Sequence, residues 1–159
     1  MAQATMMASA CLAGVCCVYD GTDNRRPFFA KLVAEKKIFL FCPELLGGMR
    51  VPHPPSEIAG GDGFGVLAGA ARVVSRDGRD VTEFFVRGAQ KALAFAHKHG
   101  VKTAVMKARS PSCGCGMIHN GTFTKTLVCG FGVTAALLKQ NGIEVISDEE
   151  YLSAVKTEE

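Results

Sequence analysis

Seven cysteines are the residues of this chain whose type and spacing could do chemistry. They are Cys11, Cys16, Cys17, Cys42, Cys113, Cys115 and Cys129. An odd count in a chain of 159 residues argues against a disulfide framework, which small secreted proteins use to compensate for a small core. The N-terminus has no Lys or Arg before Arg25, so it lacks the charged start of a secretory signal. We therefore expect a cytoplasmic protein with reduced thiols, available for metal binding or catalysis.

Three of the cysteines occupy the same kind of position. Cys11 ends the run MMASAC, Cys42 ends IFLFC, and Cys113 lies in the segment RSPSCGCG, just after the run TAVMKA. If these runs are parallel strands, their carboxyl ends share one edge of a sheet, where ligands bind in such folds. Pro111 and Gly114 favour a turn that presents Cys113 at this edge. The three thiols are therefore predicted to converge.

Three converging thiolates suit one kind of metal group better than others. A structural zinc ion takes four protein ligands, and an electron-transfer iron–sulfur cluster is usually held by four cysteines. Three ligands leave one iron of a [4Fe–4S] cluster open to a soft substrate atom. The cysteine spacing matches neither ferredoxin pattern, so the residues alone leave both a metal site and buried structural cysteines open.

The remaining cysteines have more ordinary interpretations. Of the adjacent pair Cys16 and Cys17, only one side chain can easily face the site, and Cys17 is the better candidate. Cys115 is separated from Cys113 by one residue, which makes joint chelation awkward; we expect a spectator or redox-sensitive thiol. Cys129 follows the apolar residues TLV and is expected in the core.

The four histidines do not form a ligand pattern. His97 and His99 lie near the end of a predicted helix, where a cationic or solvated role is usual. His53 and His119 lie in loops near the proposed edge, and lone histidines in loops more often form hydrogen bonds than bind metal.

Alternating helices and strands are predicted around the cysteines. The clearest helix runs through residues 80–100, with Asp80 as N-cap, Glu83 completing a capping box, and Gly100 as the left-handed C-terminal residue. The other predicted helices are PFFAKLVAEKK, GVTAALLKQNG and DEEYLSAVK, and the predicted strands are TMMASAC, IFLFC, VKTAVMKA and IEVIS. This alternation predicts a single α/β domain over residues 1–159, with three layers and a mostly parallel, Rossmann-like sheet.

The segment at 45–65 and the overall charge add two further expectations. Residues 45–65 are rich in Gly and Pro and predict a long ordered loop, which in a compact domain is usually functional. The net charge is +3 with scattered basic residues, and no apolar run reaches the roughly 20 residues of a membrane helix. We expect no nucleic-acid or membrane partner, and a monomer or homodimer.

Eight motifs in a fixed order give the chain a family resemblance. They are SACLAGVCCVYDG, CPELLGG, PHPPSEI, GGDG, DVT, KARSPSCG, NGTF and GFGVTAALL. This set resembles the thiouracil desulfidase family of small iron–sulfur domains. The resemblance implies a [4Fe–4S] cluster on Cys11, Cys42 and Cys113, and removal of sulfur from a thiolated pyrimidine such as thiouracil or its nucleotides. His53, where relatives often carry Arg, and His119-Asn120, where Tyr-Asp is more typical, depart from the family pattern.

The resemblance also suggests two catalytic residues. Glu44, two residues beyond Cys42, could orient or deprotonate the attacking water, and Ser110, three residues before Cys113, could hydrogen-bond the ring or shuttle a proton. The structural alternatives are a carboxylate that accepts backbone amides at ELLGG for Glu44, and a turn-forming or N-cap residue for Ser110. The free amides of GFGVTAALL could hold an anion, although close packing of its glycines is more ordinary.

Two rival functions remain compatible with these residues. A cluster- or zinc-dependent sulfur-carrier or redox protein would use the extra thiols of Cys16, Cys17 and Cys115 without hydrolysis. A zinc-stabilised binding module would do no chemistry.

Overall fold

A sheet of four parallel strands in the order β2-β1-β5-β8 forms the centre of the molecule. The structure is a computed structural model that describes residues 4–158, with side chains described up to residue 156. The strands are β1 (Met6–Ser9), β2 (Ile38–Phe41), β5 (Thr103–Met106) and β8 (Glu144–Ser147). All four lie in runs predicted as strands, and their parallel pairing confirms the predicted α/β class.

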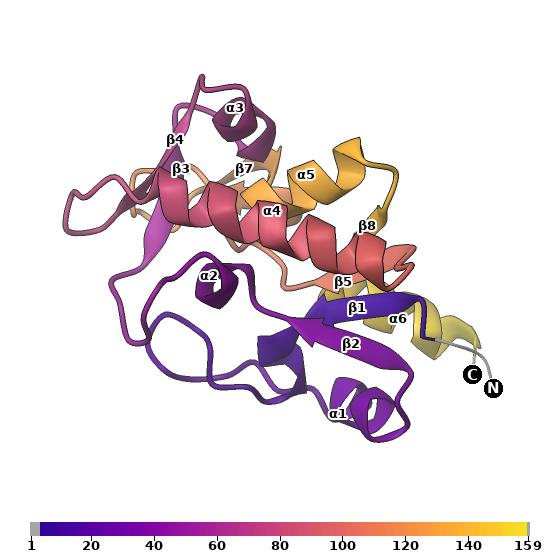
Figure 1. Cartoon of the computed structure of the whole chain (residues 1–159). Coiled ribbons are helices and arrows are strands. Elements are labelled where there is room, and N and C mark those ends of the chain that lie inside the picture. Colours follow the sequence, from indigo (N-terminus) through magenta and orange to yellow (C-terminus); the bar gives the residue numbers. More distant parts are fainter. Residues whose placement is uncertain (1–3, 159) are drawn as a thin grey trace.

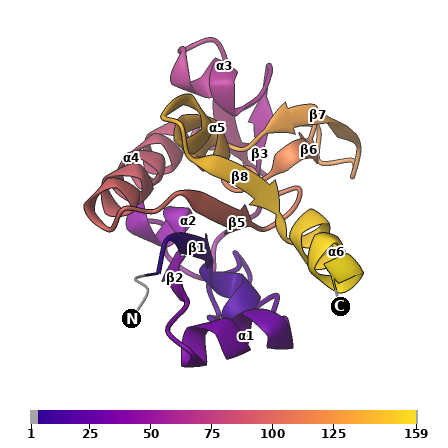
Figure 2. The ribbon, with the colours of Figure 1, turned by 90° about the vertical axis from the view of Figure 1, so that its right-hand side faces the viewer.

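Helices cover both faces of this sheet, because neighbouring residues of each strand point their apolar side chains to opposite faces. Met7 and Ala104 are paired in register and belong to one core cluster, whereas the next pair, Ala8 and Val105, belongs to another. The helices of the first layer are α4 (Thr82–Lys98) and α5 (Val133–Gln140), and those of the second are α1 (Pro27–Ala34) and α6 (Asp148–Glu158). Figure 2 shows the sheet between these two layers.

Two antiparallel hairpins extend the molecule beyond the central sheet, and the sequence did not predict them. They are β3 (Ser56–Ala59) with β4 (Arg72–Ser75), and β6 (Cys115–His119) with β7 (Leu127–Phe131). The predicted loop at 45–65 is therefore wrong in part, since it contains β3 and most of the short helix α3 (Gly63–Leu67). A third core cluster joins these elements to α4 and α5. Figure 1 shows both hairpins at the same end of the molecule.

The start of α4 differs from the predicted capping box. The helix begins at Thr82 after Val81, so Asp80 lies one residue before the N-cap. The Asp80 carboxylate still accepts a hydrogen bond from the Thr82 amide at 2.9 Å. Glu83 does not reach back to a cap; it pairs with Arg87 one turn later at 2.6 Å. The left-handed Gly100, at φ 64°, confirms the predicted end.

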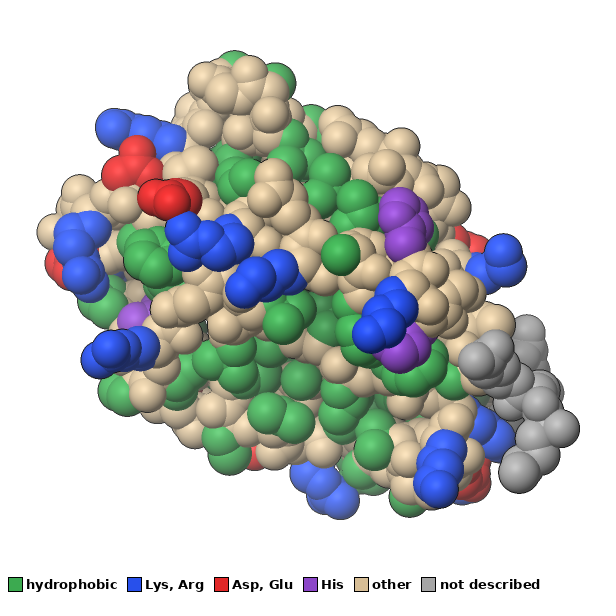
Figure 3. Space-filling model, viewed as in Figure 1, with side chains coloured by type: hydrophobic (Ala, Val, Ile, Leu, Met, Phe, Trp, Pro, Cys, Tyr) green, Lys and Arg blue, Asp and Glu red, His purple; other side chains and the backbone are tan. Residues whose placement is uncertain are grey.

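The outer surface carries basic, acidic and apolar side chains that lie among one another on the face shown in Figure 3. Within the described part of the chain, no helix combines the length and the apolar character needed to cross a membrane.

Two glycines bring the short helix α2 (Pro43–Leu46) against α4. A Cβ atom on Gly88 would lie 2.0 Å from the Pro43 carbonyl oxygen, and one on Gly47 would lie 1.9 Å from the Phe84 carbonyl oxygen. Arg87 adds a hydrogen bond from Nη1 to the Gly47 carbonyl at 3.2 Å. This backbone-to-backbone contact fixes the segment that directly follows Cys42.

Replacing Gly88 by Ala should destabilise the fold, because α2 must move away from α4 to make room for the methyl group. We expect Gly88→Ala to lower the free energy of unfolding by about 2 kcal/mol, measured by urea denaturation. Gln90→Ala, an exposed change on the same helix, is the control and should stay within about 0.5 kcal/mol of the wild type. Equal stability of the two variants would contradict the close contact.

Candidate functional site

Four cysteines line a single cavity of about 390 Å³ at the carboxyl ends of β1, β2 and β5. They are Cys11, Cys17, Cys42 and Cys113. The sequence predicted Cys11 at the end of the first strand, but β1 ends at Ser9. Cys11 lies in the 3₁₀ turn η1 (Ala10–Ala13) that follows β1. Cys42 lies between β2 and α2, and Cys113 follows β5 by a seven-residue step. The sheet edge thus brings together the three thiols that the sequence predicted to converge.

Cys17 changes the pKa values of two neighbouring thiols, Cys11 and Cys42. Hydrogen bonding to Cys17 lowers the pKa of both Cys11 and Cys42, that of Cys42 to about 7. The same hydrogen bonds to Cys11 and Cys42 raise the pKa of Cys17 far above its ordinary value. Burial is the main cause that raises the pKa of Cys113. The site therefore favours thiolates at Cys11 and Cys42.

The segment that carries Cys113 is held by hydrogen bonds at both ends. Before it, the Asp148 carboxylate at the start of α6 accepts the Ala108 amide at 2.8 Å. After it, the first amides of α5 bond to its carbonyls: Val133 to Pro111 at 2.8 Å and Thr134 to Ser112 at 2.9 Å. The N-terminal amides of a helix lack partners within the helix, and here the loop supplies them. These amides are therefore not free to hold an anion.

Gly132 makes this attachment possible. A Cβ atom at Gly132 would lie 2.5 Å from the Ser112 carbonyl carbon and 2.8 Å from the Cys113 amide nitrogen. Such an approach excludes any side chain unless the backbone shifts. The glycine of the GFG motif is therefore explained by close packing, the more ordinary of its two predicted roles.

Both predicted catalytic residues line the cavity. Glu44 lies in the first turn of α2, and burial, followed by the neighbouring Cys42 and Cys11, raises its pKa to about 8. Among the hydrogen bonds of the described residues, none from a backbone amide reaches its carboxylate, so the amide-accepting alternative finds no support. Ser110 Oγ accepts the amides of Ser112 at 3.2 Å and Cys113 at 3.1 Å, and thus forms the turn as its structural alternative predicted.

The remaining cysteines lie outside the cavity. Cys16 is exposed. Cys115 is half-buried, its thiol donates to the Cys113 carbonyl at 3.4 Å, and burial raises its pKa to about 12. The expectation that Cys129 lies in the core is wrong, because residues 127–129 at the start of β7 are all exposed.

The histidines also differ in position. His119 lines the cavity, but it ends β6 rather than lying in a loop. His53 Nδ1 lies 2.8 Å from the Pro54 carbonyl oxygen, as expected of a hydrogen-bonding loop residue. His97 is exposed at the end of α4, and His99 packs against the ring of Phe95 with centroids 4.4 Å apart.

A second wall of the cavity was not predicted from the sequence. It includes Ser56, Glu57, Arg76, Phe123 and Lys125, from β3, the residue after β4 and the 120–126 segment. Tyr19, after η1, and Lys107, directly after β5, also line the cavity. Glu57 Oε1 accepts the amides of Gly121 at 2.9 Å and Phe123 at 3.2 Å, which holds the 120–126 segment against β3. The motifs PHPPSEI and NGTF mark these residues, but their contact spans more than sixty positions and no local pattern reveals it.

The arrangement of the thiols bears on what they could hold. In the described part of the chain, no three Cys, His, Asp or Glu side chains are grouped so as to hold a single metal ion. Cys11, Cys42 and Cys113 reach one cavity from three different strand ends, and thiolate sulfur is the donor that iron–sulfur clusters take.

Adding a side chain at Gly132 should loosen the attachment of the Cys113 segment. In cluster-free protein, we expect Gly132→Ala to raise the alkylation rate of buried Cys113 by about tenfold, measured by mass spectrometry of the labelled peptide. Exposed Cys129 is the internal control, and its rate should not change. A Cys113 rate equal to that of the wild type would show that α5 does not hold the segment.

Comparison with known proteins places this arrangement in a family. The family model described as 2-thiouracil desulfurase matches residues 6–150. The uncharacterized protein YbbK of Bacillus subtilis (strain 168) is 48% identical over 145 residues, which cover 91% of this chain and 96% of that protein. The solved structure of the [4Fe-4S]-dependent thiouracil desulfidase TudS is similar, with a TM-score of 0.80, 37% identity, and coverage of 96% of this chain and 99% of that one. The chain therefore belongs to the 2-thiouracil desulfurase family.

Proposed function

We propose that this protein is a [4Fe–4S]-dependent desulfidase that hydrolyses the carbon–sulfur bond of thiolated pyrimidines such as thiouracil or its nucleotides. The observation that carries this proposal is the convergence of Cys11, Cys42 and Cys113, from three strand ends, on a cavity that also holds Glu44. Family membership and the likeness to TudS support it. Water replaces the thiocarbonyl sulfur, so thiouracil and water give uracil and hydrogen sulfide without net oxidation or reduction.

The donor set fits an iron–sulfur cluster. Cys11, Cys42 and Cys113 would hold it, and their sulfur atoms are the ligands that such clusters use. When bound on three thiolates, the cluster supplies an open iron that acts as a Lewis acid towards a soft thiocarbonyl sulfur. Cys17 lies within hydrogen-bonding reach of Cys11 and Cys42, so its single thiol proton can be donated to either sulfur.

Glu44 and Ser110 are proposed to handle protons beside the substrate. Glu44 is half-buried and faces the cavity without a backbone donor. Its pKa, raised to about 8, makes its ionised form a stronger base than an ordinary carboxylate, so that form can orient a water molecule and accept its proton. Ser110 Oγ already accepts two amides, so its hydroxyl proton remains to be donated, either to Ser112 Oγ at 3.0 Å or to the substrate ring. Ser110 thus positions Cys113 and is proposed to hydrogen-bond the ring.

We place this activity in the cytoplasm. All seven cysteines are free in the structure, and a reducing compartment preserves the thiols that the cluster requires.

Removing one of the three thiols should remove the cluster. After anaerobic reconstitution, we expect Cys113→Ser to lose most of its iron and its visible absorption, measured by iron analysis and spectroscopy, because a serine hydroxyl is a poor ligand for iron in a sulfide cluster. Cys16→Ser, a change at an exposed thiol, is the control and should reconstitute normally.

Cys17→Ser decides how many thiols hold the cluster. Three-cysteine ligation predicts normal iron content in this variant, whereas loss of iron would make Cys17 a fourth ligand and contradict an open iron.

Glu44→Gln should separate catalysis from cluster binding. The amide keeps the shape of the side chain but cannot accept the proton of water, so sulfide release from 2-thiouracil should fall by at least about 100-fold while the visible absorption is retained. Glu83→Gln, at an exposed side chain on α4, should keep full activity. Retained turnover in Glu44→Gln would refute the assignment. A wild-type requirement for an added thiol donor would instead support a sulfur carrier.

A further inference from the structure

Ser56 carries a polar group that the fold leaves without a partner. The side chain is only 8% exposed, yet among the described residues its hydroxyl has no hydrogen-bond partner, and Ser56 lines the cavity. Its cross-strand neighbour Ser75 is equally buried, but the Ser75 hydroxyl donates to Asp77. Buried hydroxyls are normally paired, and an unpaired one is costly. The Ser56 oxygen is itself shielded from solvent, and rotation about the Cα–Cβ bond would present the unpaired hydroxyl to a ligand in the cavity that Ser56 lines.

Phe123, which lines the same cavity as Ser56, has an unusual backbone conformation. Its φ is +57°, a region that bulky residues rarely adopt and that often marks a functional site. The Glu57 carboxylate holds the Phe123 amide, and the Arg76 guanidinium lies 5.6 Å from the centre of the ring. Gly121 packs so closely on β3 that a Cβ would lie 2.5 Å from the Ile58 carbonyl oxygen. These contacts hold the backbone of Phe123 at the cavity, and Arg76 lies over its ring.

We infer that Ser56 and Phe123 form the subsite that recognises the pyrimidine ring, a conclusion that rests on the proposed function. The cysteines lie at the sheet edge, whereas Ser56 and Phe123 belong to β3 and to the segment between β6 and β7. A 2-thiouracil whose sulfur points to the cysteines carries its C4 carbonyl at the meta position of the ring, on the other side of N3, where it points away from the thiols towards a side wall of the cavity. The Ser56 hydroxyl donates a hydrogen bond to that carbonyl, and Phe123 stacks on the ring.

A pair of substrates isolates the proposed hydrogen bond. Pyrimidine-2-thione has the reacting thiocarbonyl of 2-thiouracil but lacks the C4 carbonyl. In cluster-loaded protein, Ser56→Ala should raise KM for 2-thiouracil about tenfold, with kcat nearly unchanged, and leave KM for pyrimidine-2-thione unchanged. An equal change for both substrates, or no change for either, would overturn the Ser56 assignment.

Three further variants separate recognition from folding. Ser75→Ala removes a matched hydroxyl from the paired strand outside the cavity and should leave both KM values at wild-type levels. Ser56→Thr keeps the hydroxyl and should restore discrimination between the two substrates. Phe123→Ala should weaken both substrates about tenfold, because stacking does not depend on the carbonyl. Unchanged binding in Phe123→Ala would remove the ring from the subsite.

A binding measurement tests the subsite independently of catalysis. By equilibrium dialysis, wild-type protein should bind uracil about tenfold more tightly than pyrimidin-2-one, which lacks the C4 carbonyl, and Ser56→Ala should bind both equally. If the wild type released no sulfide but showed this preference, the proposed function would fail and the subsite would stand. If the wild type released sulfide but bound uracil and pyrimidin-2-one equally, only the subsite would fail.

Discussion

The site depends on the hydrogen bonds between the start of α5 and the segment that carries Cys113. Amides of residues 132–135 donate to carbonyls of Pro111, Ser112 and Gly114, so the unpaired end of a helix and the unpaired backbone of a loop satisfy each other. Gly132 allows this approach. Loops usually run over the surface, but here Ser112 and Cys113 are almost fully buried, at 2% and 4% exposed.

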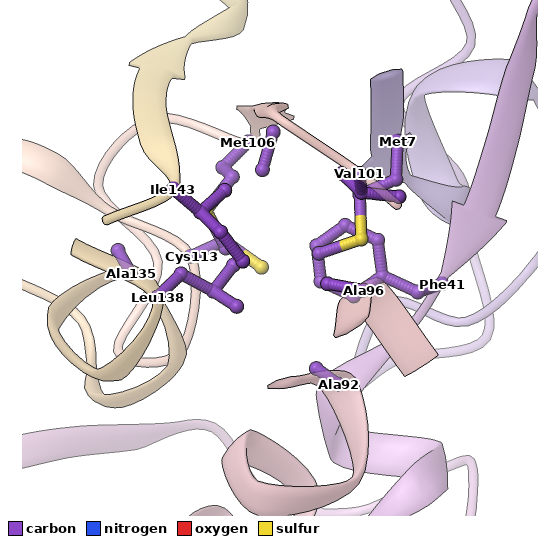
Figure 4. Packing of buried hydrophobic residues seen from close by; sticks show 11 residues of the cluster. Met7, Phe41, Ala92, Ala96, Val101, Met106, Cys113, Ala135, Leu138 and Ile143 are labelled. Carbon is purple, nitrogen blue, oxygen red and sulfur yellow. The ribbon is translucent and has the colours of Figure 1, made fainter. Parts of the chain in front are cut away.

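The same attachment makes Cys113 part of both the core and the cavity. Its side chain is 4% exposed and belongs to the cluster of Met7, Met106 and Leu138 that lies between the sheet and the first helix layer (Figure 4). Apolar burial disfavours a free thiolate, which is why the pKa of Cys113 is raised in the cluster-free protein. Metal coordination removes that penalty, because the positive charge of iron stabilises the sulfur anion where water cannot.

The central sheet and the cysteine edge could be predicted because both follow from local pattern. Each central strand is an apolar run long enough to be recognised, and parallel pairing places the cysteines together without any knowledge of contacts. The hairpins escaped prediction because their strands are not clear apolar runs: β3 and β4 carry Ser, Glu and Arg, β6 and β7 contain Gly, and Leu127, Val128 and Cys129 of β7 are exposed. The core expectation for Cys129 failed for that reason. The wall with Glu57 and Phe123 depends on a contact between distant segments, which composition and periodicity do not encode.

The two walls of the cavity differ both in how far the sequence predicted them and in the side chains that they carry. The wall at the sheet edge carries sulfur and carboxyl groups on short connections from rigid strands, which suits chemistry that needs fixed positions. The wall formed by β3 and the 120–126 segment carries a hydroxyl, an aromatic ring and basic side chains on hairpins outside the central sheet. The Glu57 contacts hold this wall together, and its core side chains pack on α4 and α5 in a cluster that contains none of the cysteines. Its cavity-facing positions can therefore change by substitution without disturbing the thiols. Departures from the family pattern at His119 and Asn120 fall on this second wall or beside it, which is where a change of substrate preference within one chemistry would arise.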